Sequence, residues 1–334
     1  MSKIAILGGG SWGTGLSVVL AHSRHKHEIR IWVRESPIAQ SMQENRENPA
    51  YLPGIPIPAC VQASNDLCEV LRDAQIVVGA VPSEHARSVY LKTTPYLSAD
   101  TAIVSATKGL EPATHLRMSE VIEQVFALQF IPRTAVLSGP SFALEAAHGD
   151  PTAVVLASQD RALAPFLQEE FAGSTFRLYT NEVVLGVELA GAMKNVMAIA
   201  AGACQGLGLG ANSLAALITR GLAEMTRLVV ALGGKRETLS GLAGLGDLVL
   251  TCHGTLSRNR HVGFELGRGR SLQEILGEMK MVAEGVGTAE ALLGLAHERG
   301  IDLPITEQVH SILRLGNSPQ DAIRAIMERP LKRE

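Results

Sequence analysis

Cysteine, aromatic residues and net charge are all scarce in this chain. Its 334 residues include 4 cysteines and 4% aromatic residues, and 30 basic and 33 acidic side chains leave a net charge of −3. The cysteines have neither C-x-x-C spacing nor a zinc-site pattern, so we expect reduced thiols, a cytoplasmic protein and no metal. The balanced charge argues against a protein that binds nucleic acid or a membrane surface.

Long uninterrupted apolar segments are also missing. The most apolar stretch, residues 183–211, contains Glu188, Lys194 and Asn195. These polar residues make it a poor membrane-spanning segment, and we interpret it as a helix buried in the protein core. The sequence passes from Met1 directly into a strand-like segment, so we expect no signal peptide and no membrane insertion.

Glycine, in contrast, is abundant, and its first cluster follows a strand-like segment. Lys3–Leu7 is apolar after its first residue, and Gly8, Gly10 and Gly13 then fit the G-x-G-x-x-G spacing. This spacing allows a tight turn, a close approach to a pyrophosphate, and a helix start whose N–H groups bind an anion. The glycine turn (residues 8–13) therefore predicts a dinucleotide site; the alternative is a strand–helix turn without a ligand.

Strand-like and helical segments alternate over the first 180 residues. This alternation predicts an α/β fold with a doubly wound, mostly parallel Rossmann-type sheet. After that point the pattern is helical with glycine-rich loops, so we predict a dinucleotide-binding domain over 1–180 and a helical substrate-binding domain over 181–334. The expected strands are 3–7, 28–33, 75–81, 102–105, 135–137, 153–156 and 175–179. The expected later helices are 183–203, 213–232, 271–279, 288–299, 305–315 and 319–327.

The end of the second expected strand bears on the choice of cofactor. An acidic residue there commonly accepts a hydrogen bond from the ribose of NAD, but this strand ends in Arg34, followed by Glu35. A basic residue suits the 2′-phosphate of NADP. We therefore expect NADP (NADPH), or both NADP and NAD (NADH); the alternative is a solvated surface arginine.

Lys194 and Asp247 are candidates for proton transfer. Lys194 lies among apolar and small residues, where a lysine is costly unless it is paired or its pKa is lowered, and such a lysine can act as a general base. It could also extend to solvent from a helix end. Asp247 lies between glycines and is expected on a tight turn, where it would accept from a substrate hydroxyl, orient Lys194, or cap the next helix.

The stretch Ser257–Arg260 combines a hydroxyl, two guanidinium groups and an amide near an expected helix start. These groups are well suited to a phosphate, although a solvated basic turn would have the same composition. The neighbouring Cys252 and His253 suggest a thiol nucleophile, but the sequence offers no partner to orient the histidine.

Together these motifs resemble bacterial-type NAD(P)-dependent sn-glycerol-3-phosphate dehydrogenases. The resemblance covers nearly the whole chain, and its ordered set is more specific than any single motif. It rests on residues 11–14, 51–54, 107–110, 138–143, 191–198, 218–225, 244–250, 257–260 and 304–307.

The resemblance implies hydride transfer between sn-glycerol 3-phosphate and the nicotinamide, with reduction of dihydroxyacetone phosphate supplying phospholipid biosynthesis. It makes Lys194 the proton acceptor and requires no metal. It places on the dinucleotide Ser11, Trp12, Arg34, Lys108 and Ala143, closed over by Arg258, Val282 and Glu284. It places around the substrate Lys108, Gly139, Ser141, Lys194, Asp247, Ser257, Arg258 and Asn259. Position 141 is often threonine in the family, and serine keeps the hydroxyl.

Two other functions fit parts of the pattern. One is a different two-domain NAD(P)-dependent dehydrogenase acting on a hydroxy acid, and the other is a non-catalytic NAD(P)-binding redox sensor. The anion-binding stretch Ser257–Arg260 argues against the first, and the buried lysine at position 194 argues against the second. The apolar helices of the second half suggest a homodimer.

Overall fold

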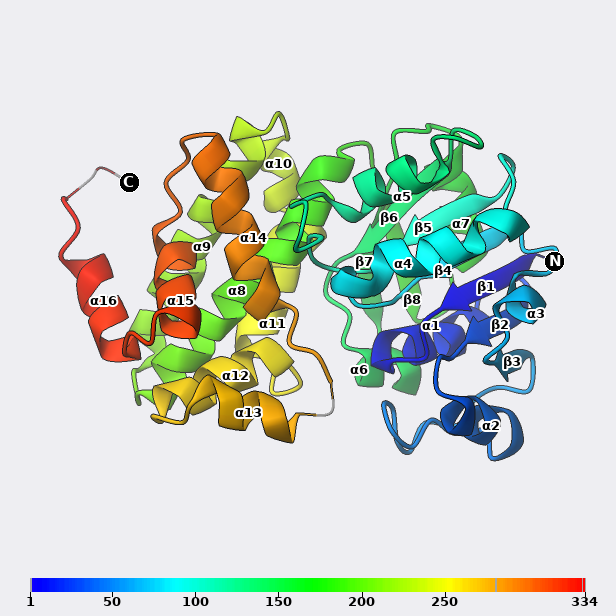
Figure 1. Ribbon diagram of the computed structural model, residues 1–334, viewed down its shortest axis with the longest axis horizontal. Helices are drawn as coiled ribbons and strands as arrows, with labels where there is room; N and C mark the ends of the chain where they lie inside the picture. Colours follow the sequence, from blue (N-terminus) through cyan, green and yellow to red (C-terminus); the bar gives the residue numbers. More distant parts are fainter. Residues whose placement is uncertain (1, 280, 332, 334) are drawn as a thin grey trace. The chain divides into compact units, whose positions relative to one another are not determined.

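The computed structural model describes residues 2–279, 281–331 and 333 (Figure 1). Contacts within the chain group it into two compact units. The first unit comprises residues 1–111 and 116–188, and the second comprises residues 112–115 and 189–334. The short segment 112–115 thus belongs by its contacts to the later part of the chain.

An eight-stranded sheet forms the centre of the first unit, with the strand order β3-β2-β1-β4-β5-β6-β7-β8. Neighbouring strands are parallel except β6 and β7, which are antiparallel. The predicted Rossmann-type α/β fold is therefore confirmed. The strands are β1 (Lys3–Leu7), β2 (Glu28–Trp32), β3 (Val61–Ser64), β4 (Ile76–Gly79), β5 (Ala102–Ser105), β6 (Arg133–Ser138), β7 (Thr152–Ala157) and β8 (Phe176–Asn181).

The middle of the sheet is covered on both faces, which explains its apolar sequence. Every residue of β4 and β5 is buried, as expected for parallel strands with helices on each side. The order of strands reverses beside β1, which pairs with β2 on one side and with β4 on the other. Ligands of such sheets bind at this switch point, outside the carboxyl ends of the strands.

Helices connect the strands of the first unit. They are α1 (Ser11–Ala21), α2 (Ser36–Glu44), α3 (Leu67–Leu71), α4 (Ser83–Thr93), a 3-10 turn (Thr94–Tyr96), α5 (Met118–Phe126), α6 (Ala143–His148) and α7 (Leu163–Phe171). Sequence reasoning missed strand β3 and helix α6. β3 contains one buried apolar residue, Val61, at the edge of the sheet, and α6 is a single short segment of six residues, so neither has a clear hydrophobic period.

Helices make up the second unit, as predicted. They are α8 (Val184–Gly206), which begins in the first unit, α9 (Ala211–Ala231), α10 (Arg236–Leu239), a π-helical turn (Leu242–Gly246), α11 (Asp247–His253), α12 (Arg258–Gly267), α13 (Leu272–Glu278), α14 (Gly285–Glu298), α15 (Pro304–Arg314) and α16 (Pro319–Met327). Helix α8 has the length and composition of a membrane span, but 89% of its most apolar window is buried inside the protein.

The segment 236–267 is more helical than the sequence interpretation, which placed glycine-rich loops there and expected a helix start only near Ser257–Arg260. It contains α10, α11 and α12, because several of its glycines lie at helix contacts rather than in turns. A Cβ atom on Gly263 of α12 would lie 1.9 Å from the carbonyl oxygen of Ile199, and one on Gly202 of α8 would lie 1.9 Å from that of Arg260. Only glycine permits this approach of α8 to α12.

Candidate functional site

The glycine turn connects β1 to α1 at the switch point of the sheet. Gly8 has φ +119°, and a Cβ atom there would lie 2.7 Å from the carbonyl oxygen of Ala80; one on Gly13 would lie 1.9 Å from that of Gly8. Both positions therefore require glycine. No described atom lies within 4 Å of a Cβ built on Gly10, so that glycine leaves open space at the start of α1.

This turn suits a pyrophosphate. The first turn of α1 contains no acidic side chain, and the amide groups at a helix N-terminus carry partial positive charge without acceptors inside the helix. The indole Nε1 of Trp12 is buried without a hydrogen-bond partner among the described residues. The structure therefore leaves open space at Gly10, with Ser11 and Trp12 beside it, at the place where the sequence predicts a dinucleotide phosphate.

Arg34 lies two residues beyond the end of β2, where the sequence places it. Its side chain is 68% exposed and pairs with Glu35 at 2.6 Å between Nη2 and Oε1. The hydrogen bonds that Arg34 donates to the Glu35 carboxylate raise the pKa of Arg34. The arginine is therefore accessible to an anion, but a 2′-phosphate would compete with its own neighbour.

The structure brings Lys108, Gly139 and Ser141 together beyond the ends of β5 and β6. The Nζ of Lys108 donates to the carbonyl oxygen of Gly139 at 2.8 Å and approaches Ser141 Oγ at 3.5 Å. Gly139 has φ +127°, a conformation that favours glycine. Nearby, Ala143 begins α6, and its carbonyl oxygen would lie 2.9 Å from a Cβ on Gly15 of α1.

A buried lysine–aspartate pair forms the chemical centre of the second unit. Lys194, on α8, is 6% exposed, and Asp247, the first residue of α11, is 0% exposed. The Nζ of Lys194 donates to Asp247 Oδ1 at 2.5 Å and to Thr251 Oγ1 at 2.9 Å. The Thr251 hydroxyl donates to the carbonyl oxygen of Asp247 at 2.6 Å. An ammonium group is thus held by a carboxylate and a hydroxyl, both from α11.

Two features of this centre differ from the sequence interpretation. Asp247 does not lie on a tight turn; it begins α11 directly after the π-helical turn, and its side chain faces Lys194. Thr251 was not selected as a site residue, yet it lies one helical turn after Asp247 on the same face. The spacing of four residues between Asp247 and Thr251 could have identified Thr251, but this spacing places two side chains on one face only if the segment is helical.

The Cys252–His253 alternative does not fit the structure. Cys252 is fully buried, and burial raises the pKa of its thiol to about 12. His253 is exposed. A thiol with so high a pKa is not a nucleophile at neutral pH.

The stretch Ser257–Arg260, which the sequence predicts to bind an anion, forms the N-cap and first residues of α12. Ser257 Oγ accepts from the N–H of Arg260 at 3.2 Å, and Asn259 Oδ1 accepts from the N–H of Gly285 at 2.9 Å, so that its amide Nδ2 is the remaining donor. Arg258 keeps exposed surface, yet desolvation by the surrounding protein lowers its pKa, which Glu284 opposes. A positive charge crowded in this way gains by pairing with an anion.

Arg260, in contrast, has a structural role. Its guanidinium donates to the carbonyl oxygen of Gly254 at 3.0 Å and to Gln205 Oε1 at 2.5 Å. The resemblance also predicts that Val282 and Glu284 close over the dinucleotide. Glu284 immediately precedes α14, and Val282 is 44% exposed. In the part of the chain that the structure describes, no group of three or more His, Cys, Asp or Glu side chains could hold a metal ion.

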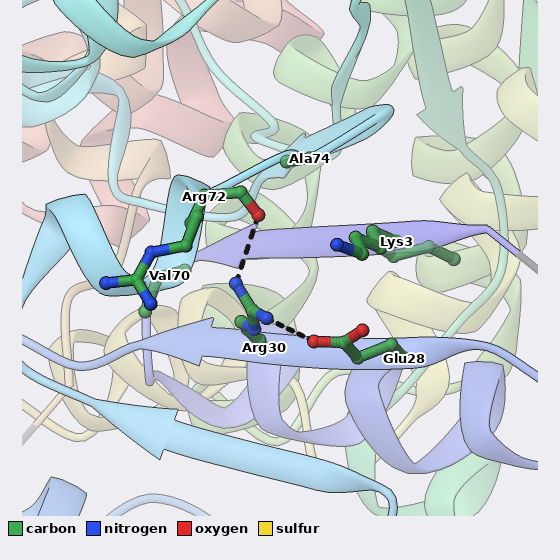
Figure 2. Close-up of a pocket in the computed structure, with 7 residues that line it drawn as sticks. Lys3, Glu28, Arg30, Val70, Arg72 and Ala74 are labelled. Atoms are coloured by element: carbon green, nitrogen blue, oxygen red, sulfur yellow. Dashed lines mark hydrogen bonds and ion pairs between the residues drawn. The ribbon is translucent and has the colours of Figure 1, made fainter.

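Figure 2 shows a hollow at the opposite, amino-terminal edge of the sheet. Its cation Arg30 donates to the carbonyl oxygens of Glu69 and Arg72, both at 3.0 Å, and pairs with Glu28. Lys3, also in the lining, pairs with Asp73 at 3.0 Å. The cations of Arg30 and Lys3 are thus engaged within the protein.

A glycine turn at the switch point of a mostly parallel sheet, followed by a helical unit with a buried lysine, is typical of Rossmann-type oxidoreductases. Two family models agree: the N-terminus of NAD-dependent glycerol-3-phosphate dehydrogenase matches residues 3–164, and its C-terminus matches residues 184–324. The chain belongs to this family.

Individual relatives agree over the full length. The glycerol-3-phosphate dehydrogenase (NAD(P)+) of Koribacter versatilis is 54% identical over 331 residues, covering 99% of this chain and 98% of that protein. That of Acidobacterium capsulatum is 52% identical over 335 residues, covering 99% of each. The crystal structure of glycerol-3-phosphate dehydrogenase from Coxiella burnetii has a TM-score of 0.93 and 44% identity, covering 98% of this chain and 99% of that one.

Proposed function

We propose that this chain is an NAD(P)-dependent oxidoreductase that interconverts sn-glycerol 3-phosphate and dihydroxyacetone phosphate, supplying glycerol 3-phosphate for phospholipid biosynthesis. The observation that carries the chemistry is the buried Lys194 ammonium held by Asp247 and Thr251. The family membership supports the substrate pair, and it favours this function over a hydroxyacid dehydrogenase or a redox sensor.

Lys194 is the proposed proton donor and acceptor. An opposite charge at hydrogen-bond distance favours the charged form of an amine, so Asp247 keeps Lys194 ready as an ammonium. That form polarises the C2 carbonyl of dihydroxyacetone phosphate and gives it a proton; in the reverse direction the neutral amine takes the proton of the 2-hydroxyl. A bound dinucleotide would supply or accept the hydride through C4 of its nicotinamide ring.

The remaining predicted residues divide between the two units. We assign the dinucleotide to Gly8, Gly10, Ser11, Trp12, Gly13, Arg34, Lys108 and Ala143, with Arg258, Val282 and Glu284 closing over it. We assign the substrate to Lys108, Gly139, Ser141, Asp247, Ser257, Arg258 and Asn259, besides Lys194. The stretch Ser257–Asn259 would hold the phosphate away from the reacting carbon, so that its binding energy orients C2.

The proposed domains are residues 1–180 for the dinucleotide and 181–334 for the substrate and catalysis. We further propose a cytoplasmic homodimer. Exposed apolar side chains of the second unit support self-association, among them Val230 on α9 and Val249 on α11, which are 48% and 40% exposed. Sedimentation equilibrium tests the dimer, and a monomer at micromolar concentration contradicts it.

The activity itself has a direct test. Purified protein mixed with NADPH and dihydroxyacetone phosphate should lose the NADPH absorbance band, and sn-glycerol 3-phosphate should appear as product. Parallel reactions with NADH measure cofactor preference, and reactions with an unphosphorylated ketone or a 2-keto acid serve as controls. Consumption of NADPH with the keto acid but not with dihydroxyacetone phosphate would refute the proposal.

A further inference from the structure

A single buried side chain, Asn48, connects the glycine turn to the proline loop (residues 45–60). Asn48 is 0% exposed. Its Nδ2 donates to the carbonyl oxygen of Gly9 and to Thr14 Oγ1, both at 2.8 Å, and its Oδ1 accepts from the N–H of Tyr51 at 3.1 Å. Both ends of the amide are therefore used, one on the glycine turn and one within the loop.

The rest of the proline loop forms a firm base for this contact. The guanidinium of Arg46 donates to the carbonyl oxygens of Ile57 and Val61 at 3.1 and 2.8 Å, which closes the loop. Leu52 and Ile55 are buried in a cluster with Val18 of α1. The loop is thus fixed independently at its base and on α1, so that Asn48 is presented to the glycine turn by an ordered segment.

The contact fixes the orientation of one peptide group. The carbonyl of Gly9 and the N–H of Gly10 belong to the same planar trans peptide and point in opposite directions. By holding the Gly9 oxygen, Asn48 also sets the direction of the Gly10 N–H, away from the proline loop. Gly10 is the glycine whose Cβ position is open, so this N–H belongs to the part of the turn that a phosphate can approach.

Asn48 also places the segment beside the start of α1. The Tyr51 N–H is bound by Asn48, and the Tyr51 carbonyl oxygen accepts from Ser11 Oγ at 2.6 Å. Ser11 is the first residue of α1 and one of the proposed cofactor contacts. The same side chain thus constrains both the peptide before Gly10 and the partner of Ser11.

We propose that Asn48 is a positioning residue for dinucleotide binding, which orients the Gly10 N–H for the diphosphate of the cofactor. It does not itself touch the cofactor. This inference rests on the proposed placement of the dinucleotide at the glycine turn.

Calorimetric titration with NADPH tests the proposal. Asn48→Ala should raise the dissociation constant at least tenfold, whereas kcat at saturating NADPH should stay within threefold of the wild-type value. Ser158→Ala is the matched control: Ser158 is 1% exposed and makes two hydrogen bonds, to the carbonyl of Thr134 at 2.8 Å and from the N–H of Asp160 at 3.1 Å. Ser158 directly follows β7 and lies beside the start of β6, at the end of the strands away from the glycine turn. Its replacement by alanine should lower the melting temperature without changing the affinity for NADPH.

An Asn48→Ala variant that folds and binds NADPH like the control overturns the proposal. If this variant does not fold, Thr14→Val is the alternative: it keeps the side-chain shape but removes one acceptor of Asn48 and the Thr14 hydroxyl's own hydrogen bond to the Gly9 carbonyl oxygen at 3.3 Å. This variant should raise the dissociation constant two- to fivefold, and no change overturns the proposal. Gly10→Val distinguishes an error in the cofactor placement from an error in the role of Asn48. Normal NADPH binding by Gly10→Val would refute the cofactor placement itself, whereas lost binding there with normal binding by Asn48→Ala would refute only the positioning role.

Discussion

Lys194 combines two properties that rarely occur in one side chain, namely a charge and near-complete burial. The charge is tolerated because Asp247 and Thr251 supply an anion and a hydroxyl at hydrogen-bond distance. A lysine held in this way keeps one orientation, and a proton donor gains most from a fixed position relative to its acceptor. Substitution of single residues therefore tests the proposed chemistry most directly.

Lys194→Ala should reduce kcat by about 10²–10⁴-fold, the range over which a positioned acid or base contributes. NADPH affinity should be unchanged, because the proposed cofactor contacts lie mostly in the first unit. Steady-state kinetics and calorimetric titration on the same preparation measure both quantities. Near-normal turnover would refute the assigned proton donor, and loss of NADPH binding would indicate a structural defect instead.

Arg258→Ala should raise KM for dihydroxyacetone phosphate by one to two orders of magnitude, because a charge-assisted hydrogen bond contributes about 1.5–3 kcal/mol. The melting temperature should change little, since Arg258 is an exposed residue whose desolvated charge gains no stability from burial. Arg260→Ala is the contrasting variant: its hydrogen bonds to Gly254 and Gln205 predict lost stability. An unchanged KM in Arg258→Ala would place the phosphate elsewhere.

Strand β4 and helix α4 pack so closely that one added carbon atom would clash. On β4, a Cβ on Gly79 would lie 2.0 Å from the hydroxyl oxygen and 2.9 Å from Cζ of Tyr90 on α4. The Tyr90 hydroxyl is buried without a hydrogen-bond partner among the described residues, and burial, with the Glu188 carboxylate second, raises its pKa. Strand and helix are therefore packed at the limit of van der Waals contact.

Gly79→Ala should destabilise the protein by about 3 kcal/mol through overpacking. Tyr90→Phe alone should be within about 1 kcal/mol of neutral, because the lost hydroxyl satisfied no partner. The double variant should recover much of the Gly79→Ala loss, since the atom at 2.0 Å is gone and only the contact at 2.9 Å remains. Urea unfolding of the three variants measures the coupling, and strictly additive effects would contradict this packing.

Glu224 links α9 to α15. Its carboxylate accepts from the N–H groups of Ile305 and Thr306 at 2.8 and 2.9 Å and from Thr306 Oγ1 at 2.6 Å. It therefore caps the start of α15 from another helix. These contacts explain the motifs 218–225 and 304–307, which have no role in the proposed chemistry.

Glu224→Gln should destabilise the protein by about 1–3 kcal/mol, because an amide nitrogen would face a backbone N–H. Burial raises the pKa of Glu224 above its ordinary value of 4.5. The carboxyl group therefore contributes most stability at low pH, and this contribution is lost as pH rises through the folded-state pKa. The difference in stability between wild type and Glu224→Gln should narrow as the pH rises above 4.5, the ordinary pKa of the group; a widening difference would contradict the assignment.

Sequence reasoning succeeded where a residue pattern reports local geometry. The glycine turn, the apolar segments that became β4 and β5, and Arg34 beyond β2 depend on neighbours in sequence. Within residues 236–267 it found only the helix start near Ser257–Arg260, because a glycine at a helix contact and a glycine in a loop cannot be told apart from the sequence. Thr251 and Asn48 were missed for a related reason, since their partners lie on other segments and become neighbours only after folding.

At the scale of the whole molecule, two compact units divide the proposed tasks. Most of the proposed cofactor contacts, including the glycine turn, belong to the first unit, whereas Lys194 and Asp247 belong to the second. Ligand binding to a folded unit stabilises it by mass action. Unfolding measured with and without the cofactor therefore shows which of the two units the cofactor stabilises.

NADPH at 100 times its dissociation constant should stabilise the protein by about 2.7 kcal/mol. We expect scanning calorimetry to show a melting temperature several degrees higher with NADPH, and the same shift in Lys194→Ala. Dihydroxyacetone phosphate alone should give a smaller shift. If Lys194→Ala loses the NADPH-dependent shift, the proposed separation of cofactor binding from proton transfer is wrong.

The glycine contact between α8 and α12 has a consequence for which molecules fit. Lys194 lies on α8, two turns or about 12 Å before Gly202, and α12 starts with Arg258 and Asn259. Because backbone meets glycine between these helices, their separation cannot adjust to a longer or shorter ligand. If Lys194 is the proton donor and the start of α12 holds the phosphate, as proposed, the fixed separation of these two helices would set the distance between the two groups, and substrates would be selected by length as well as by charge.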